Sequence, residues 1–346
     1  MDETTAPNEP RDPGSLHIPV MLERCVELLL PALEGHDAVL VDATLGLGGH
    51  TAALLAAAPR LTVVGLDRDQ QALALAVRRL GPLAERLRPV HTVYDRLRAS
   101  LDELGIDRVD GVLFDLGVSS MQLDDDSRGF SYARDTALDM RMDQSSGLTA
   151  REILASYSAA ELARIFARFG EERLAGRYAD AIVRERERAP IESSARLVQL
   201  LSDATPAALR DKGHPAKRVF QALRIEVNRE LAALADALPQ AIDALRPGGR
   251  IVAMSYQSLE DRLVKRALAE GSRSSAPAGL PLELPEHRPR LRLLTRGAER
   301  ASAQEAERNP RAIPVRLRAA EKLHAERDTS GSTSRKRRAG KERAAA

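Results

Sequence analysis

The chain has 346 residues, which is long enough for two domains, one of them with a full α/β core. Its apolar (43%) and charged (29%) fractions are those of an ordinary soluble protein, and its single cysteine fits a reducing compartment such as the cytoplasm. No apolar run approaches the roughly 20 residues that a membrane helix needs, and the polar residues 1–15 are unlike a signal peptide. We therefore expect a cytoplasmic protein with no membrane contact.

Charge is distributed unevenly along the chain. The formal net charge is +2, but residues 330–346 alone carry +5, which leaves −3 for the rest. Any nucleic-acid surface on the folded part must then be a local patch. We expect residues 1–15 and 326–346 to be disordered. The basic tail is compatible with a loose phosphate tether and equally with an inert solvated end.

The segment 39–50 (VLVDATLGLGGH) predicts a buried strand, a glycine-rich turn and the start of a helix over 51–58. This order is typical of a nucleotide-type pocket at the carboxyl edge of a parallel sheet. Glycine lets the backbone approach a ligand, and the helix N-terminus offers N–H groups to its anionic part. Gly46 and Gly48 match a dinucleotide fingerprint, but Thr51 stands where that fingerprint has glycine or alanine.

A second strand is predicted over 61–66, and it ends in Asp67. A carboxylate at this position suits the two hydroxyls of a ribose. Folds that bind NAD and folds that bind S-adenosylmethionine (AdoMet) share such an acid, so both cofactors stay open at this point. The glycine pattern favours AdoMet.

Asp115 ends a third predicted strand, which begins at residue 109, and a glycine turn follows it. In a doubly wound sheet this strand neighbours the first, which places Asp115 beside the cofactor. Another strand is predicted over 249–255. Because strands alternate with helical stretches, we predict an α/β fold with a doubly wound, mostly parallel sheet.

Many more residues separate Asp115 from the strand at 249 than one crossover helix requires. Apolar residues recur there at helical spacing, and they predict an all-helical domain over 126–213, inserted into a sheet domain of residues 16–125 and 214–325. The helices are expected over 150–154, 159–169, 171–188 and 194–204. One long helix over 216–238 and a mobile loop over 269–289 complete the layout.

Ten sequence blocks between residues 17 and 320 resemble, in the same order, those of the ribosomal RNA small subunit methyltransferase H family. The blocks are residues 17–22, 42–50, 67–69, 115–120, 128–131, 138–143, 220–225, 228–231, 258–262 and 309–312. The resemblance implies a class I AdoMet-dependent methyltransferase domain with a helical insert. It further implies methylation of the N4 amine of a decoding-region cytidine in 16S rRNA, within the assembled 30S subunit.

The resemblance also implies a set of cofactor-binding residues: Gly48, Gly49, His50, Asp67, Tyr94, Asp115 and Gln122. The first three would contact the methionine part of AdoMet, Asp67 the ribose and Tyr94 the adenine. On the residues alone, core packing for Tyr94 and a helix-start role for His50 are the simpler interpretations.

For catalysis we expect Asp115, or a backbone carbonyl of its turn, to orient the amine that receives the methyl group. No metal is expected, because methyl transfer needs no Lewis acid and the run 124–126 of three aspartates suits a turn or a helix cap. Contacts with RNA phosphates are predicted from basic residues, each equally compatible with a solvated surface. These are Lys217, Arg218, Arg224, Arg288, Arg290 and Arg292.

The chain departs from the family pattern at three places: Met121 replaces a proline, Gln257 a histidine, and Ile313-Pro314 an arginine-serine pair. The alternatives to an rRNA methyltransferase include a DNA amino-methyltransferase and an assembly factor that binds AdoMet without turnover. The missing prolines after Asp115 disfavour the DNA enzyme, and a NAD oxidoreductase is weaker still.

Overall fold

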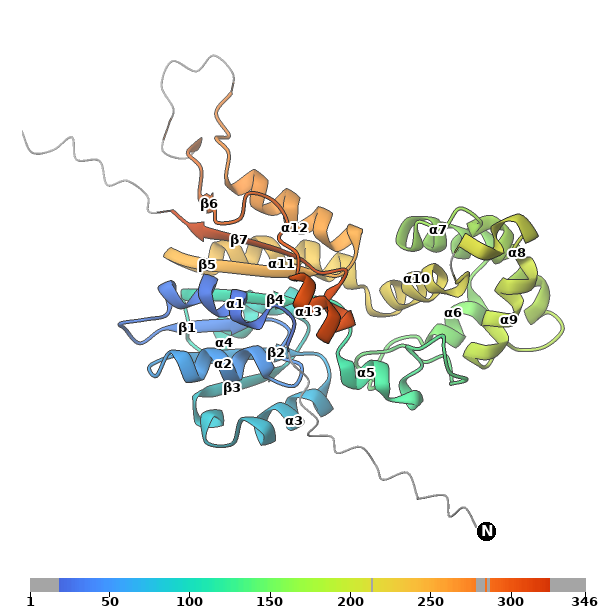
Figure 1. The fold of residues 1–346 in the computed structure, drawn as a ribbon, viewed down its shortest axis with the longest axis horizontal. Coiled ribbons are helices and arrows are strands. Elements are labelled where there is room, and N and C mark those ends of the chain that lie inside the picture. The colour runs from blue at the N-terminus through green and yellow to red at the C-terminus, as the bar shows by residue number, and fades with distance from the viewer. Residues whose placement is uncertain (1–18, 213, 278–283, 285–286, 324–346) are drawn as a thin grey trace, which may run out of the picture.

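The computed structural model describes residues 19–212, 214–277, 284 and 287–323 (Figure 1). The segments that we expected to be disordered, 1–15 and 326–346, lie outside these residues, as does part of the expected loop 269–289. No helix within the described ranges is long and apolar enough to cross a membrane.

A seven-stranded sheet with the order β3-β2-β1-β4-β5-β7-β6 forms the centre of the molecule. Its strands are β1 (Val39–Asp42), β2 (Thr62–Asp67), β3 (Leu87–His91), β4 (Val109–Asp115), β5 (Leu245–Ser255), β6 (Leu291–Leu293) and β7 (Arg316–Lys322). The strands from β3 to β5 are parallel, and β7 is antiparallel to both of its neighbours. This topology confirms the predicted doubly wound, mostly parallel sheet.

Alternating residues of the central strands face opposite sides of the sheet. Leu40 contributes to one buried cluster and Val41 to the other, and Val63 and Val64 divide in the same way. Both faces are covered, which explains the continuous apolar runs that the sequence shows. One face packs against α1 (Leu22–Leu29), α2 (Gly49–Ala57) and α3 (Gln70–Leu80), and the other against α4 (Leu97–Glu103), α11 (Glu230–Ala244) and α12 (Ser258–Gly271).

A separate lobe of helices lies beside the sheet (Figure 1). It contains α6 (Ala150–Ser156), α7 (Ala159–Gly170), α8 (Ala175–Arg186), α9 (Ser194–Ala204) and α10 (Ala216–Asn228). The first four agree closely with the predicted helices. Thr149 and Ser158 cap α6 and α7, because each accepts a backbone N–H with its side chain while the glutamate three residues on accepts the cap residue's own N–H.

The segment 216–238 differs from the prediction of one long helix. The structure breaks it into α10 and α11 at Arg229, whose φ of 51° is in the left-handed region. Five buried residues of α10 join the helical cluster, although we expected this segment to pack with the sheet. At Gly170 of α7, helices α7 and α10 approach so closely that an added Cβ would lie 2.6 Å from the carbonyl oxygen of Arg218. The helical lobe is therefore closed by a helix from beyond the predicted insert.

Candidate active site

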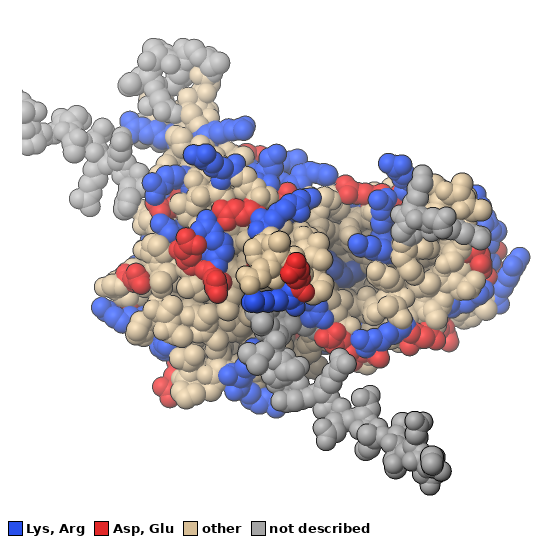
Figure 2. Space-filling view, in the orientation of Figure 1, with Lys and Arg blue, Asp and Glu red and all other residues tan. Residues whose placement is uncertain are grey.

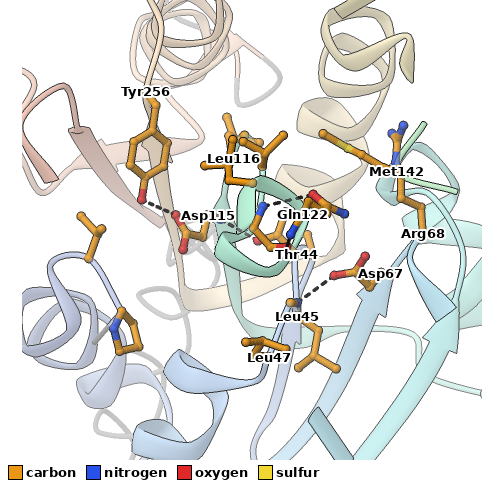
Figure 3. Close-up of a pocket in the computed structure, with 18 of the residues that line it drawn as sticks. Thr44, Leu45, Leu47, Asp67, Arg68, Asp115, Leu116, Gln122, Met142 and Tyr256 are labelled. Carbon is orange, nitrogen blue, oxygen red and sulfur yellow. Dashed lines mark hydrogen bonds between the residues drawn. The ribbon is translucent and has the colours of Figure 1, made fainter. Parts of the chain in front are cut away.

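A cavity of about 470 Å³ opens at the carboxyl ends of β1, β2 and β4 (Figure 3). This is where the strand order reverses, since β1 lies between β2 and β4, and ligands bind at such a point in open α/β sheets. Residues from the loop after β1, from α5 (Ser120–Asp124) and from α10 complete its wall. The cavity thus lies between the sheet and the helical lobe.

The loop after β1 is held to both neighbouring strands. The backbone N–H of Leu45 donates to the carbonyl of Leu66 at 2.9 Å, and that of Gly46 donates to Oδ2 of Asp67 at 2.8 Å. On the other side, the backbone N–H of Asp115 donates to Oγ1 of Thr44 at 2.7 Å. Gly46 has a φ of 52°, which few other residues adopt at low cost. The loop is therefore fixed before any ligand enters.

Asp42 joins the end of β1 to the first turn of α2. Its carboxylate accepts the hydroxyl of Thr51 at 2.7 Å and the backbone N–H of Thr44 at 3.2 Å. Burial raises the pKa of this carboxyl group, and the two donors oppose that effect. Thr51, which breaks the dinucleotide fingerprint, thus has a structural partner at the base of the turn.

Asp67 lies at the cavity wall, and each of its carboxylate oxygens accepts one backbone hydrogen bond. Oδ2 accepts the N–H of Gly46, and Oδ1 accepts the N–H of Asp69 at 2.9 Å. Burial raises its pKa to about 6, and these two hydrogen bonds act in the opposite direction. At neutral pH the group is mainly ionised, and each oxygen keeps a lone pair for a further donor.

Tyr94 occupies a position between the core and the cavity. Its ring meets Phe114 edge-to-face at a centroid distance of 5.9 Å, and its other surface lines the cavity. The guanidinium of Arg68 lies 5.8 Å from the ring centroid. Core packing and ligand contact, which the sequence left as alternatives, are thus compatible at this residue.

The glycine-histidine part of the motif divides between the cavity and its support. Gly49 and His50 line the cavity, whereas Gly48 does not. A Cβ added to Gly48 would point at Ala76 and Leu80 of α3. Gly48 begins α2 with a φ of 72° and no side-chain cap, so the first-turn N–H groups remain open to a ligand. His50 is buried, and its Nε2 lies 3.0 Å from the carbonyl oxygen of Val20.

Asp115 is placed at the opposite wall from Asp67 (Figure 3). Its Oδ1 accepts the hydroxyl hydrogen of Tyr256 at 2.7 Å, and its Oδ2 lies 3.7 Å from Nδ1 of His50. Tyr256 follows β5, the strand that pairs with β4 in parallel register. This contact was not predictable from the sequence, because 141 positions separate the two residues.

Gln122 lines the cavity, but its amide is already used within the protein. Its Oε1 accepts the backbone N–H of Ser119 at 3.1 Å, and its Nε2 donates to Oδ2 of Asp69 at 3.0 Å. Arg128 donates to the same oxygen at 2.8 Å. The amide keeps one N–H and one lone pair for a ligand.

The run of three aspartates confirms the prediction of a turn or cap. Asp125 accepts the backbone N–H of Ser127, while Asp124 pairs with Arg311 and Asp126 with Arg134. Within the described ranges no group of three or more His, Cys, Asp or Glu side chains is arranged to hold a metal ion.

Three of the six cations predicted to contact phosphate form ion pairs with acidic side chains within the described residues. Arg224 forms a two-bond pair with Glu230 at 2.8 Å, and Arg290 and Arg292 pair with Asp243 and Glu321. Of the predicted set, only Lys217 and Arg224 line the cavity. Figure 2 shows basic and acidic side chains interspersed over the visible face. Lys217 is exposed, and no acidic partner is seen for it in the part of the chain that is described.

The three departures from the family pattern have different surroundings. Gln257 does not line the cavity, and its Nε2 donates to Glu260 at 3.0 Å just before α12. Ile313 is 61% exposed, and its neighbour Pro314 lines the cavity. Met121 lies on α5 without lining the cavity.

The residues that line the cavity are compatible with AdoMet: the carboxylate of Asp67 could accept from a ribose, the uncapped start of α2 could face a methionine carboxylate, and Tyr94 could lie against an adenine. With the strand order, these features define a class I AdoMet-dependent methyltransferase. The chain belongs to the MraW methylase family, whose model matches residues 14–323. The family resemblance is thereby confirmed.

Similar proteins cover nearly the same length. The chain is 63% identical over 319 residues to the ribosomal RNA small subunit methyltransferase H of Leifsonia xyli subsp. xyli, covering 92% of this chain and 98% of that protein. It is 60% identical over 308 residues to the protein of the same name from Saccharopolyspora erythraea, covering 89% and 93%. With the protein of that name from Mycolicibacterium smegmatis the identity is 58% over 318 residues, covering 90% and 85%.

Proposed function

We propose that this protein methylates the N4 exocyclic amine of a cytidine in 16S rRNA, in the decoding region of the 30S subunit and in the cytoplasm. The observation that carries the proposal is that Asp67 and Asp115 line one cavity at the switch point of the sheet. One carboxylate suits the sugar of a methyl donor, and the other suits the hydrogen of an amine. The names of the similar proteins support ribosomal RNA of the small subunit as the substrate.

At the donor end, Asp67 would accept the ribose hydroxyls with the lone pairs that its two backbone donors leave free. The open N–H groups at the start of α2 would bind the carboxylate of the methionine part, and Tyr94 would pack on the adenine. AdoMet bound in this way supplies an electrophilic methyl group on a sulfonium sulfur. Since the loop after β1 is already fixed, little ordering is needed on binding.

At the acceptor end, the chemistry requires a correctly oriented amine. The lone pair of a cytosine amine is delocalised into the ring, so the nitrogen is a poor nucleophile. Asp115 accepts an N–H of this amine and turns the lone pair toward the methyl group. The N–C bond forms as the C–S bond breaks with its electrons on sulfur, and the nitrogen then loses a proton to water. Holding the amine and the methyl group together in one cavity can lower the barrier by roughly 7–11 kcal/mol, and the orientation by Asp115 is one part of that effect.

The target base must leave its stack to reach this cavity, so a single-stranded or splayed nucleotide is the natural substrate. Leu116, Val118 and Met142 give the cavity an apolar lining. Lys217, exposed at its edge, is placed to meet a phosphate of the same strand.

The test is methylation of 30S subunits isolated from cells that lack this enzyme, followed by mass spectrometry of the nucleosides. Wild-type protein should yield N4-methylcytidine. Asp115→Asn should lower kcat by about 10²–10⁴-fold and still bind S-adenosylhomocysteine. Asp180→Asn, at an exposed site on α8, serves as the matched control.

Three outcomes would contradict the proposal. Methylation of an atom other than N4 would contradict the proposed target. Undiminished turnover by Asp115→Asn would show that Asp115 does not orient the amine. Tight binding of S-adenosylhomocysteine with no methyl transfer to any form of the subunit would favour a non-catalytic assembly factor.

A further inference from the structure

We infer that Tyr256 is a positioning residue of the reaction: its hydroxyl fixes Oδ1 of Asp115 so that Oδ2 faces the amine of the target cytosine. The inference rests on the proposed function. It begins from the 2.7 Å hydrogen bond between Tyr256 and Asp115, which Figure 3 shows at the edge of the cavity. Both residues line that cavity.

The direction of this hydrogen bond is defined. Burial and the neighbouring charge of Asp115 raise the pKa of Tyr256 well above its usual range, so the hydroxyl keeps its proton at any physiological pH. Tyr256 is therefore the donor in this hydrogen bond, and Oδ1 of Asp115 is the acceptor.

The second oxygen of Asp115 has no comparable donor within the described residues. The ring nitrogen that faces it, Nδ1 of His50, is 3.7 Å away, which is beyond hydrogen-bond distance. The other ring nitrogen, Nε2, lies 3.0 Å from the carbonyl oxygen of Val20, which can only accept, so Nε2 donates to that carbonyl and is not available to Asp115. Oδ2 is left as the acceptor for an N–H of the substrate.

The ring of Tyr256 is held independently of its hydroxyl. Its backbone N–H donates to Oε2 of Glu260 at 3.0 Å. On the other side, the ring packs on the turn after β4, since a Cβ at Gly117 would lie 3.6 Å from Cδ2 of Tyr256. Removal of the hydroxyl alone should therefore leave the aromatic ring in place.

Without the hydroxyl, the carboxylate of Asp115 is free to rotate. The terminal torsion of an aspartate is broad, and its backbone anchor, the hydrogen bond to Thr44, does not restrain it. The acceptor oxygen would then sample orientations that do not direct the amine lone pair at the methyl group. The cost should appear in kcat and not in cofactor affinity.

The test compares Tyr256→Phe with Tyr157→Phe on 30S subunits. Tyr157 is the matched control because it donates to Glu226 at 3.0 Å in the same manner, away from the cavity. Tyr256→Phe should lower kcat by about 10–100-fold. Its Kd for S-adenosylhomocysteine should stay within about twofold of the wild type, since positioning acts only on the reacting geometry. Tyr157→Phe should leave both values unchanged.

A double variant separates positioning from general structure. In an Asp115→Ala background, where no carboxylate remains for the tyrosine to orient, Tyr256→Phe should cause no further loss of kcat. The inference is overturned if Tyr256→Phe has wild-type kcat, or if its loss is equally large in the Asp115→Ala background. If the wild-type protein makes no N4-methylcytidine at all, the proposed function fails first and the inference falls with it.

Discussion

Arg128 and Asp69 form a buried ion pair that joins the segment after α5 to the end of β2. Nη2 of Arg128 lies 2.8 Å from Oδ2 of Asp69, and the two side chains are only 2% and 3% exposed. Arg128 also donates to the carbonyl of Met142 at 2.8 Å, and Asp69 caps α3. This pair therefore connects the segment that leads into the helical lobe to the turn after β2, the strand that ends in Asp67.

Loss of this arginine should destabilise the whole protein. In Arg128→Met the side-chain volume is kept, but the buried carboxylate of Asp69 loses its countercharge, which costs about 3–5 kcal/mol of unfolding free energy. Urea unfolding measures the difference. The control is Arg134→Met, whose pair with Asp126 is 50% and 58% exposed and should contribute less than about 1 kcal/mol. Equal losses in the two variants would contradict the role given to the buried pair.

Thr44→Val should weaken the attachment of the loop after β1. The substitution keeps the shape of the side chain but removes the acceptor of the Asp115 backbone N–H. A polar group left without a partner in a partly buried place costs about 1–3 kcal/mol, measured by thermal or urea unfolding. Thr62→Val on β2 is the control, because its hydroxyl makes no hydrogen bond that is seen within the described residues. A loss no larger than the control's would show that the loop is held by its other contacts.

Cofactor affinity should fall as the pH drops through about 6. The raised pKa of Asp67 means that its carboxylate is protonated below that value, and one of its acceptors for the ribose is then lost. With a folded-state pKa of about 6, the ionised fraction decreases about tenfold between pH 7 and pH 5. Calorimetry should therefore show that the affinity for S-adenosylhomocysteine falls by up to about tenfold between pH 7 and pH 5.

The control for the pH series is Asp67→Asn, which cannot ionise. It should bind S-adenosylhomocysteine weakly at both pH values and show little dependence on pH. A wild-type affinity that stays constant from pH 7 to pH 5, or an Asp67→Asn variant with the same dependence as the wild type, would be inconsistent with ribose binding at this carboxylate.

Lys217→Ala should reduce the affinity for the 30S subunit without changing cofactor binding. Each phosphate contact contributes about 0.7 to the slope of log K against log salt for single strands, so the variant should have a slope smaller by about that amount. Lys265→Ala, an exposed lysine on α12 that does not line the cavity, is the matched control. Identical salt slopes for Lys217→Ala and the wild type would show that Lys217 does not contact an RNA phosphate.

The sequence predicted the elements whose signals are local. The strands at 39–42 and 109–115 are apolar runs closed by an acid, and four helices of the lobe follow the 3.6-residue period. The position of Asp67 and Asp115 at one edge of the sheet followed from the parallel topology, because carboxyl ends of parallel strands meet there.

Features that depend on distant partners were not predictable. The break at Arg229 contains neither glycine nor proline, and nearby side chains favour it: Arg224 pairs with Glu230, and Asn228 donates to the carbonyl of Met140. The contact of Tyr256 with Asp115 depends on the register of β4 with β5. No periodicity in the chain encodes such pairs, although Tyr256 lies two residues before the family block at 258–262.

A crystal structure of the protein with S-adenosylhomocysteine tests the central claim most directly, because it shows both ends of the cavity at once. We predict that the ribose hydroxyls bind Asp67 and that the sulfur faces Oδ2 of Asp115, with the hydrogen bond from Tyr256 to Oδ1 retained. A ligand whose sulfur lies away from Asp115, or one bound outside the cavity at the ends of β1, β2 and β4, would contradict it.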